Sequence, residues 1–147
     1  MAAPARQLAV LVVDDDPGDV LLIEEALERS GQIQGVHVAG DGHDAVAFLR
    51  RTGQYTDAPR PDVILLDLNM PRMNGRQVLA KVKTDPLLRS IPILVFTTSQ
   101  DPNDIVACYD LHANAYVTKP LNLEEFTTTI ARIGEFFAQI VALPTAS

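Results

Sequence analysis

Two patterns of hydrophobic and polar residues alternate along the chain. Five short apolar runs, several of them continuous, are typical of parallel strands that are buried on both faces. These runs span Leu8–Val13, Val36–Ala39, Val63–Leu66, Ile91–Phe96 and Ala115–Thr118. After each run, apolar residues recur at intervals of three or four, which is the spacing of an amphipathic helix. The pattern therefore predicts five repeats of a strand followed by a helix.

The apolar positions of the predicted helices form five groups. They are Val20, Ile23 and Leu27; Ala45, Phe48 and Leu49; Val78, Leu79 and Val82; Ile105, Val106, Tyr109 and Leu111; and Phe126, Ile130, Ile133, Phe137 and Ile140. Residues 52–61 are polar and contain proline, which predicts a loop before the third strand. Repeats of this kind predict an α/β fold, with helices on both faces of a doubly wound parallel sheet. We expect one domain over residues 1–147, with its core at about residues 8–141 and no output domain.

Composition narrows the class of protein. The length of 147 residues suits a single domain, and a hydrophobic share of 47% suffices for one core. The formal net charge of −7 disfavours nucleic-acid binding, because an acidic surface repels phosphates. No segment approaches the roughly 18 apolar residues of a membrane helix, and the single cysteine, Cys108, points to a reducing compartment. We therefore expect a cytoplasmic protein that binds neither nucleic acid nor membrane.

Polar side chains follow four of the five predicted strands. They are Asp14, Asp15 and Asp16 after the first, Asp67 after the third, Thr97, Thr98 and Ser99 after the fourth, and Lys119 after the fifth. Because ligands of such sheets bind at the carboxyl ends of the strands, we expect these groups to converge there. Clustered carboxylates repel one another unless a cation lies among them. Oxygen ligands without imidazole or thiolate select Mg²⁺ or Mn²⁺, so the sequence predicts a site for one of these ions.

Other polar residues have structural interpretations. Asp16 and Asp19 flank Pro17-Gly18 and are expected to cap the first predicted helix rather than to bind metal. Asp62 is expected at the start of the third strand, far from the site. The three histidines lack the spacing of metal ligands, so solvated or capping roles are expected for them.

Four sequence blocks stand in order along most of the chain. They read LVVDD up to Asp15, LLDLNMPRMNG up to Gly75, FTTS up to Ser99 and YVTKP up to Pro120. Each block alone is a weak signal, but together they resemble the response-regulator receiver domains of bacterial two-component signalling. The resemblance runs from about Leu8 to the fifth predicted helix. It implies the flavodoxin-like receiver fold, with strand order 2-1-3-4-5.

The resemblance implies roles for the carboxylates. Asp67 would be the phosphoacceptor, which attacks phosphorus and forms an aspartyl phosphate. Asp14 and Asp15 would hold Mg²⁺ or Mn²⁺ together with Asp67 and the backbone carbonyl of Asn69. The ion would offset charge in a transfer that depends on positioning and electrostatics. The chain would be a signalling phosphoacceptor with magnesium-dependent self-phosphorylation and self-dephosphorylation, and not a metabolic enzyme.

The fourth and fifth strands would complete this machinery. Lys119 would pair with a phosphoryl oxygen, and its peptide bond to Pro120 would be cis. Thr97 would turn its hydroxyl toward the phosphoryl group, and Tyr116 would then change rotamer. Thr98 is the alternative switch hydroxyl, although the register of its block favours Thr97.

The resemblance also implies partners. A sensor histidine kinase or a histidine phosphotransfer protein would donate the phosphoryl group. Pro17-Gly18-Asp19, the loop at residues 52–61 and the ending Leu143-Pro144 resemble stand-alone receivers that are paired with bacterial phytochrome kinases.

A homodimer is also expected. Phe136, Val141 and Leu143 exceed the apolar stripe that the last helix needs for its core face. Left exposed beside Tyr116, they would form a patch of the kind that marks interfaces. The simplest partner for that patch is a second copy, related by a two-fold axis.

Three other functions compete with this interpretation. A phosphate-independent docking receiver would not require the phosphorylation residues, yet this chain has all five of them: Asp14, Asp15, Asp67, Thr97 and Lys119. An aspartate-nucleophile phosphatase requires a second acid two residues after the nucleophile, where this chain has Asn69. A nucleotide- or flavin-binding module would carry a glycine-rich phosphate loop after a strand, and none is present.

Overall fold

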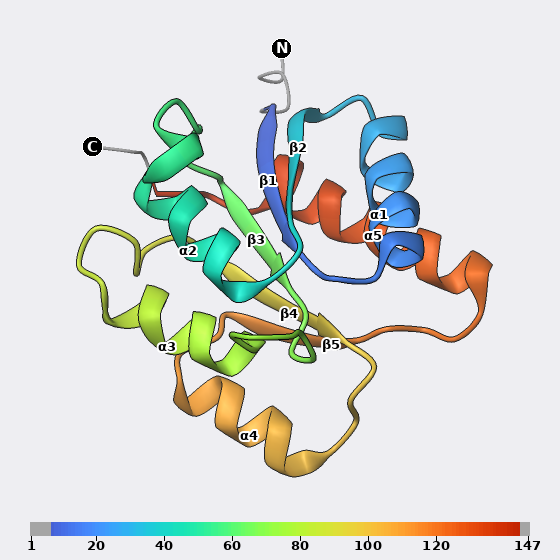
Figure 1. The fold of residues 1–147 in the computed structure, drawn as a ribbon. Coiled ribbons are helices and arrows are strands. Elements are labelled where there is room, and N and C mark those ends of the chain that lie inside the picture. Colours follow the sequence, from blue (N-terminus) through green and yellow to red (C-terminus); the bar gives the residue numbers. More distant parts are fainter. Residues whose placement is uncertain (1–6, 145–147) are drawn as a thin grey trace.

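The computed structural model describes residues 7–144 as a parallel sheet with helices on both faces (Figure 1). The strands are β1 (Leu8–Val13), β2 (Ile33–Ala39), β3 (Val63–Leu66), β4 (Ile93–Thr97) and β5 (Ala115–Thr118). The helices are α1 (Pro17–Arg29), α2 (Gly42–Arg50), α3 (Gly75–Thr84), α4 (Pro102–Asp110) and α5 (Leu123–Glu135). The strand order is β2-β1-β3-β4-β5 and every pair is parallel, which confirms the doubly wound, flavodoxin-like fold.

The sheet separates two apolar clusters. Successive residues of a strand point to opposite faces. Leu11 and Val13 of β1 therefore join the cluster that includes α2, α3 and α4, whereas Val10 and Val12 join the cluster that includes α1 and α5. β1, β3 and β4 are buried along their whole length, as their continuous apolar runs predict. The central strands are thus fixed from both sides, and their carboxyl ends lie together at one edge.

Each α-helix begins at an acidic or amide N-cap. The caps are Asp16, Asp41, Asn74, Asp101 and Asn122. Each side chain accepts hydrogen bonds from backbone N–H groups of the first turn, which would otherwise lack partners. At α3, Asn74 and Gln77 bond each other's backbone in a capping box. These caps start the helices soon after the strands end, so the polar residues at the edge lie on short, well-defined loops.

The last helix ends differently from the prediction. After α5, one turn of π-helix follows, at Phe136–Ile140. The first four residues of the predicted stripe are buried, but Ile140 is 73% exposed, so its assignment to the stripe is wrong. The i→i+5 hydrogen bonds of a π-helix widen the turn and rotate this residue outward. Even with this extension, no helix within residues 7–144 is long and apolar enough to cross a membrane.

The predicted apolar patch beside Tyr116 is also wrong. Val141 and Leu143 are partly buried against the cluster that includes α1 and α5. Tyr116 packs against the cluster on the opposite face of the sheet. Of the three surplus residues only Phe136 is exposed, at 48%. The chain after the π-helix therefore covers its own core instead of extending the surface around Tyr116.

Candidate functional site

Three carboxylates gather at the carboxyl edge of the sheet. β1 and β3 are neighbours, and the Asp67 N–H donates to the Val13 carbonyl at 2.9 Å. Asp14 and Asp67 are buried, with exposed fractions of 3% and 8%, whereas Asp15 is exposed. One oxygen from each of the three carboxylates lies within 4.8 Å of the others. The structure thus brings Asp14, Asp15 and Asp67 together, as the sequence predicts.

Lys119 adds a buried cation to this cluster from the end of β5. Its Nζ donates to carboxylate oxygens of Asp14 at 2.8 Å, Asp19 at 2.8 Å and Asp67 at 3.2 Å. Burial disfavours the charge, but the hydrogen bonds to Asp14 and Asp19 outweigh it and raise the pKa of Lys119 above its ordinary value. Lys119 is therefore protonated at neutral pH and offsets part of the negative charge around it.

Burial has the opposite consequence for Asp14. Desolvation is the largest influence and raises the pKa of this carboxyl, although hydrogen bonds from Lys119 and the backbone of Asp16 lower it. The Asp16 N–H donates to Asp14 Oδ1 at 2.9 Å. Because burial makes the Asp14 carboxyl costly to ionise, any further positive charge nearby stabilises its ionised form.

The prediction that Asp19 caps α1 is wrong, whereas that for Asp16 is confirmed. Asp16 Oδ1 accepts from the N–H groups of Gly18 at 2.9 Å and Asp19 at 3.1 Å. The Asp19 carboxylate instead accepts from Lys119. The reason is the position of Asp19 inside the first turn of α1, where its side chain reaches the buried ammonium and Asp16 already bonds the free N–H groups.

The loop after Asp67 is packed against a glycine. The Gly75 N–H donates to the Leu68 carbonyl at 3.0 Å, and a β-carbon on Gly75 would lie 2.3 Å from the Asp67 backbone oxygen. Only glycine allows this approach without displacing the backbone of Asp67. Asn69 lies between them, exposed, with its N–H 3.4 Å from Asp67 Oδ1.

Two predicted details at the strand ends have opposite outcomes. The bond between Lys119 and Pro120 is trans, like every described peptide bond, so the expected cis bond is wrong. A trans bond before proline is the favoured form by about 0.5–1 kcal/mol. Asp62 precedes β3 and accepts from the Ala9 N–H at 2.9 Å, next to the start of β1 and away from the site, as expected.

Thr97 and Tyr116 lie on the same face of the sheet. Tyr116 is paired with Val95, and alternation along β4 places Thr97 on the side of Val95. Thr97 is fully buried and its hydroxyl has no hydrogen-bond partner within residues 7–144, which costs about 1–3 kcal/mol. Tyr116 is partly buried, and its hydroxyl donates to the Ser99 carbonyl at 2.9 Å. Thr98, the alternative switch residue, is exposed.

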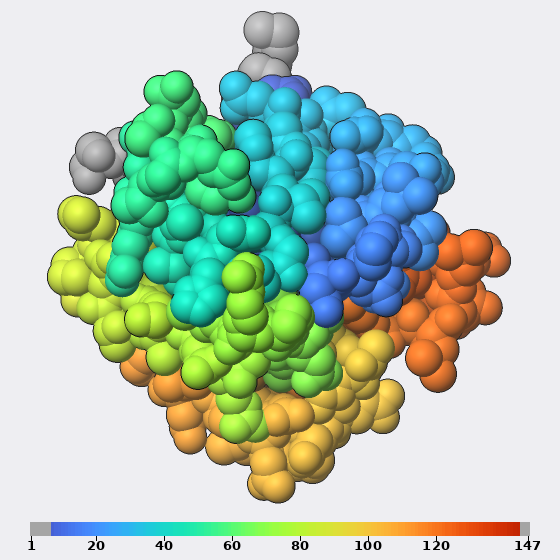
Figure 2. All heavy atoms as spheres, in the orientation of Figure 1, coloured from blue at the N-terminus to red at the C-terminus, as the bar shows by residue number. Residues whose placement is uncertain are grey.

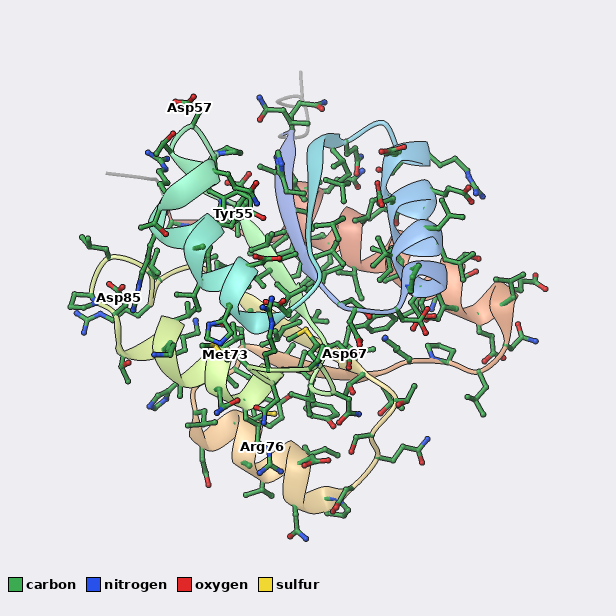
Figure 3. All side chains as sticks on the ribbon, in the orientation of Figure 1. Tyr55, Asp57, Asp67, Met73, Arg76 and Asp85 are labelled. Atoms are coloured by element: carbon green, nitrogen blue, oxygen red, sulfur yellow. The ribbon has the colours of Figure 1, made fainter. Side chains whose placement is uncertain are left out.

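A cleft of about 740 Å³ opens beside the acidic cluster. It is lined by Asp15, Leu68, Asn69, Met70, Pro71, Asn74, Arg76 and Asp104. Figure 2 shows the face on which the β1–α1 loop, the start of α2 and the β3–α3 loop meet at the surface. Arg76 lies between α3 and α4 (Figure 3) and forms an ion pair with Asp104. Charged groups therefore line the cleft on both sides.

Comparison with known families agrees with the four blocks. A family model described as "Response regulator receiver domain" matches residues 10–131. The chain belongs to this family. The resemblance inferred from the sequence is thereby confirmed over most of the chain.

The relatives of this receiver include response regulators, two of which, RcpA and RtBRR, are named as phytochrome response regulators. Response regulator Rcp1 of Synechocystis sp. is 42% identical over 93% of both chains. The Mn²⁺-bound form of Rcp1 has a TM-score of 0.90 at 40% identity, covering 94% of this chain and 99% of that chain. The phosphorylated cyanobacterial phytochrome response regulator RcpA has a TM-score of 0.91 at 43% identity, covering 95% and 99%. The bacteriophytochrome response regulator RtBRR has a TM-score of 0.73 at 40% identity, covering 96% and 86%.

The donor set of the receiver fits a divalent cation that prefers oxygen. The clustered groups are three carboxylates, with no imidazole or thiolate among them. Asp15 is exposed and lines the cleft with Asn69, so an ion could reach the cluster from solvent. The buried carboxylates of Asp14 and Asp67 share one ammonium, that of Lys119, so a further cation would offset negative charge that this ammonium leaves. These properties suit Mg²⁺ or Mn²⁺, which take carboxylate and carbonyl oxygens and keep several waters.

Sequence reasoning missed three residues near the site. The place of Asp19 in the site could have been predicted, because Asp19 lies in the first turn of a helix that starts at the carboxyl edge of the sheet. Arg76 and Asp104 pair across 28 positions of the chain, and no local pattern signals such a contact.

Proposed function

We propose that this receiver is a response regulator that accepts a phosphoryl group on Asp67 and relays the signal through Thr97 and Tyr116. The observation that carries the proposal is the placement of Asp67. This nearly buried carboxylate lies beside Asp14 and a cleft, and Lys119 bonds it at 3.2 Å. Phosphoryl transfer depends mostly on positioning and charge compensation, and this arrangement supplies both.

In the proposed transfer, a carboxylate oxygen of Asp67 attacks the phosphorus of a phosphohistidine on the donor. The P–O bond forms as the P–N bond breaks, and the imidazole nitrogen keeps the electron pair. Lys119 stays protonated and places its charge beside the phosphoryl oxygens. Asp14, Asp15, Asp67 and the backbone carbonyl of Asn69 would hold Mg²⁺ or Mn²⁺, and the bound ion would neutralise further charge on those oxygens. Attack by water on the aspartyl phosphate regenerates Asp67 and releases inorganic phosphate.

The unpaired hydroxyl of Thr97 supports its role as the switch. A hydroxyl buried without a partner gains a hydrogen bond if it turns to a phosphoryl oxygen on Asp67. Movement of Thr97 would carry Ser99 with it, and the Tyr116 hydroxyl is bonded to the Ser99 carbonyl. A response of Tyr116 would then follow from phosphorylation.

The phosphoryl donor is proposed to be a histidine kinase of the phytochrome type or a histidine phosphotransfer protein. The relatives RcpA and RtBRR, which are phytochrome response regulators, favour the first. Leu21 of α1 is 57% exposed, Leu121 in the loop before α5 is 98% exposed, and Leu123, the first residue of α5, is 62% exposed. Exposed apolar side chains on the two elements that flank the site suit the docking of a helical partner.

We also propose that the receiver forms a homodimer. Phe136 and Ile140 remain exposed at the end of the last helix. Two such side chains, repeated by a two-fold axis, would give a self-complementary apolar contact.

Incubation with acetyl phosphate and Mg²⁺ tests the assignment of the acceptor. One phosphoryl group should be added and should map to Asp67, EDTA should prevent it, and Asp67→Asn should abolish it. Asp62→Asn is the matched control, because this second carboxylate beside β3 lies away from the site and should leave labelling intact. Undiminished labelling of Asp67→Asn would exclude the proposed acceptor.

A further inference from the structure

The loop of residues 68–74, named the acceptor loop, leads from the acidic cluster to α3 and is held at both ends. At its base, the Gly75 N–H donates to the Leu68 carbonyl at 3.0 Å. At its far end, the Met73 carbonyl accepts at 3.2 Å from the N–H of Gly42, the first residue of α2. Met73 accordingly lies between the start of α2 and α3 (Figure 3). The position of the acceptor loop therefore depends on α2 as well as on β3.

An ion pair accompanies the contact at the far end. The Arg72 guanidinium donates to Oδ2 of Asp41, the N-cap of α2. Burial of Asp41 opposes its ionisation, but hydrogen bonds from Arg72 and from the Asp44 N–H outweigh it and lower the pKa of this carboxyl. Arg72 has a φ of 63°, in the left-handed region that residues other than glycine rarely adopt. Such a conformation persists where neighbouring contacts hold the residue in place, and Asp41 supplies one of them.

The backbones of α2 and the acceptor loop approach each other closely at this point. A β-carbon on Gly42 would lie 2.4 Å from the Met73 carbonyl oxygen and 2.5 Å from the Met73 β-carbon. Asp41 and Arg72 come directly before the two residues of this contact. The Asp41 side chain is 10% exposed, whereas that of Arg72 is 62% exposed. The ion pair thus joins a buried cap to an exposed guanidinium across a close backbone contact.

The end of β2 also contacts the other side of the acidic cluster. The Ala39 carbonyl accepts from the Asp14 N–H at 3.1 Å. Residues 39–42 therefore contact both the backbone of Asp14 and the far end of the acceptor loop. Asn69, whose carbonyl is a proposed ligand of the cation, lies in that loop and lines the cleft with Asp15. The spacing between the two sides of the proposed cation site hence depends on this short segment.

We propose that Asp41 is a positioning residue that, through Arg72, holds the acceptor loop where it helps to bind a divalent cation. The inference rests on the proposed function, which places Mg²⁺ or Mn²⁺ at the three clustered carboxylates and the carbonyl of Asn69. Asp41 is not itself a ligand, because its two oxygens accept from the Asp44 N–H and from Arg72. Without the ion pair, the loop occupies the binding position in a smaller fraction of molecules. The apparent dissociation constant of the cation then rises in inverse proportion to that fraction.

Titration with Mn²⁺, followed by the EPR signal of the unbound ion, tests the inference. Asp41→Asn removes the ion pair and keeps an oxygen that can cap α2, and Arg72→Gln removes the same pair from the other side. We expect each variant to raise the Mn²⁺ dissociation constant about threefold, within the roughly 1.4- to 5-fold effect of partly exposed ion pairs. The double variant should bind like the weaker single one, because both substitutions remove one contact. In each variant the Gly42 N–H should exchange faster with solvent, since its acceptor on Met73 is held less firmly, and an unchanged rate counts against the role of Asp41.

Long-range electrostatics predicts a different pattern. Arg72→Gln removes a positive charge and would tighten the binding of a cation, whereas Asp41→Asn removes a negative charge and would weaken it. Weaker binding by both variants therefore identifies an effect of position. Arg72→Lys keeps a cation facing Asp41 and should retain more affinity than Arg72→Gln. Arg50→Gln is the matched control, because it breaks the arginine–aspartate pair with Asp85 at the other end of α2 and should leave the dissociation constant unchanged.

Three results would overturn the proposal: tighter binding by Arg72→Gln, unchanged binding by both variants, or equal weakening by Arg50→Gln. A wild type that binds no Mn²⁺ at millimolar concentrations overturns the proposed cation site, and this inference with it. Binding that survives Asp14→Asn together with Asp15→Asn has the same consequence. Binding that depends on Asp14 and Asp15 but not on Asp41 leaves the proposed function intact and overturns this inference alone.

Discussion

Replacing Lys119 by methionine tests whether the buried ammonium holds the acidic edge together. Methionine keeps an unbranched side chain of similar reach and removes the three Nζ contacts with Asp14, Asp19 and Asp67. The lysine side chain is only 4% exposed, so water cannot replace it as a partner for the buried oxygens. The variant therefore contains clustered carboxylates without their internal cation.

The magnitude follows from the burial of the partners. Removing one member of a buried ion pair costs about 3–5 kcal/mol. Asp14 and Asp67 have side chains that are 3% and 10% exposed, whereas Asp19 is 26% exposed and can be hydrated. We expect the free energy of unfolding at neutral pH, without divalent ions, to fall by about 3 kcal/mol, measured by urea denaturation.

The size of this loss should depend on pH. Burial already raises the pKa of Asp14, and removal of the Lys119 hydrogen bond raises it further. Protonation of Asp14 relieves the repulsion in the folded variant, so the loss is full above the raised pKa and shrinks as the pH falls through it. In the wild type, the raised pKa of Lys119 stabilises the fold from neutral pH up to the ordinary lysine pKa of 10.5, and this contribution is lost as the pH rises through the raised value.

Lys83→Met is the matched control. Lys83 is also partly buried, but its Nζ donates to the backbone carbonyls of Arg89 and Ile91 and to the Asn114 side chain, and to no carboxylate among the described residues. Its loss of stability should be the same at neutral and mildly acidic pH and with or without Mg²⁺. Mg²⁺ should stabilise Lys119→Met more than the wild type, because the freed carboxylates gain a cation. A loss below about 1 kcal/mol, the range of exposed ion pairs, or a loss that Mg²⁺ leaves unchanged would refute the reasoning.

Three further predictions concern the switch, the acceptor loop and assembly. Thr97→Val should raise the free energy of unfolding by about 1 kcal/mol, because valine has nearly the same shape and lacks the unpaired hydroxyl. The same variant should abolish the NMR response to beryllofluoride. Thr98→Val, at an exposed position, should change neither the stability nor this response. Gly75→Ala should cost about 1–3 kcal/mol in thermal or urea unfolding and slow the labelling of Asp67, whereas Gly40→Ala, where a β-carbon meets open space, should be close to neutral. Sedimentation should show a dimer that Phe136→Ser and Ile140→Ser weaken, and a wild-type monomer at high concentration would contradict the proposed self-association.

β1 and β3 could be predicted from the sequence because they are buried at every residue, whereas β4 begins at Ile93 and ends at Thr97, two residues and one residue later than its predicted run. β3 is the same four residues in the prediction and in the structure, and all four are buried. β2 begins at Ile33, three residues before its predicted run, because Gln34 and Gly35 interrupt the apolar pattern of this edge strand. Edge strands are half exposed, so backbone pairing with a neighbour extends them beyond what side-chain hydrophobicity signals. The predicted burial of Ile140 was wrong for a different reason, since a periodicity of 3.6 residues does not predict a π-turn.

The site was predictable to the extent that its residues directly follow strands. Asp14, Asp15 and Asp67 meet because parallel strands deliver their carboxyl ends to one edge, and the resemblance to receiver domains implied the strand order. Asp19 approaches Lys119 across 100 positions, and Arg76 approaches Asp104 across 28. Such pairs depend on how helices are placed on the sheet, which the hydrophobic pattern constrains only to within a turn.

Lys119 and Thr97 differ in how many hydrogen-bond partners their polar groups have. The ammonium of Lys119 has three carboxylate partners, more than one cation can neutralise, and the hydroxyl of Thr97 has none although it is fully buried. A phosphoryl group on Asp67 would change both conditions at once, because its oxygens accept hydrogen bonds from an ammonium and from a hydroxyl. Lys119 could then exchange a carboxylate contact for a phosphoryl contact at little cost, whereas Thr97 would gain a bond that it lacks. The driving force for rearrangement therefore lies with Thr97, and Lys119 mainly provides a charge that is already in place.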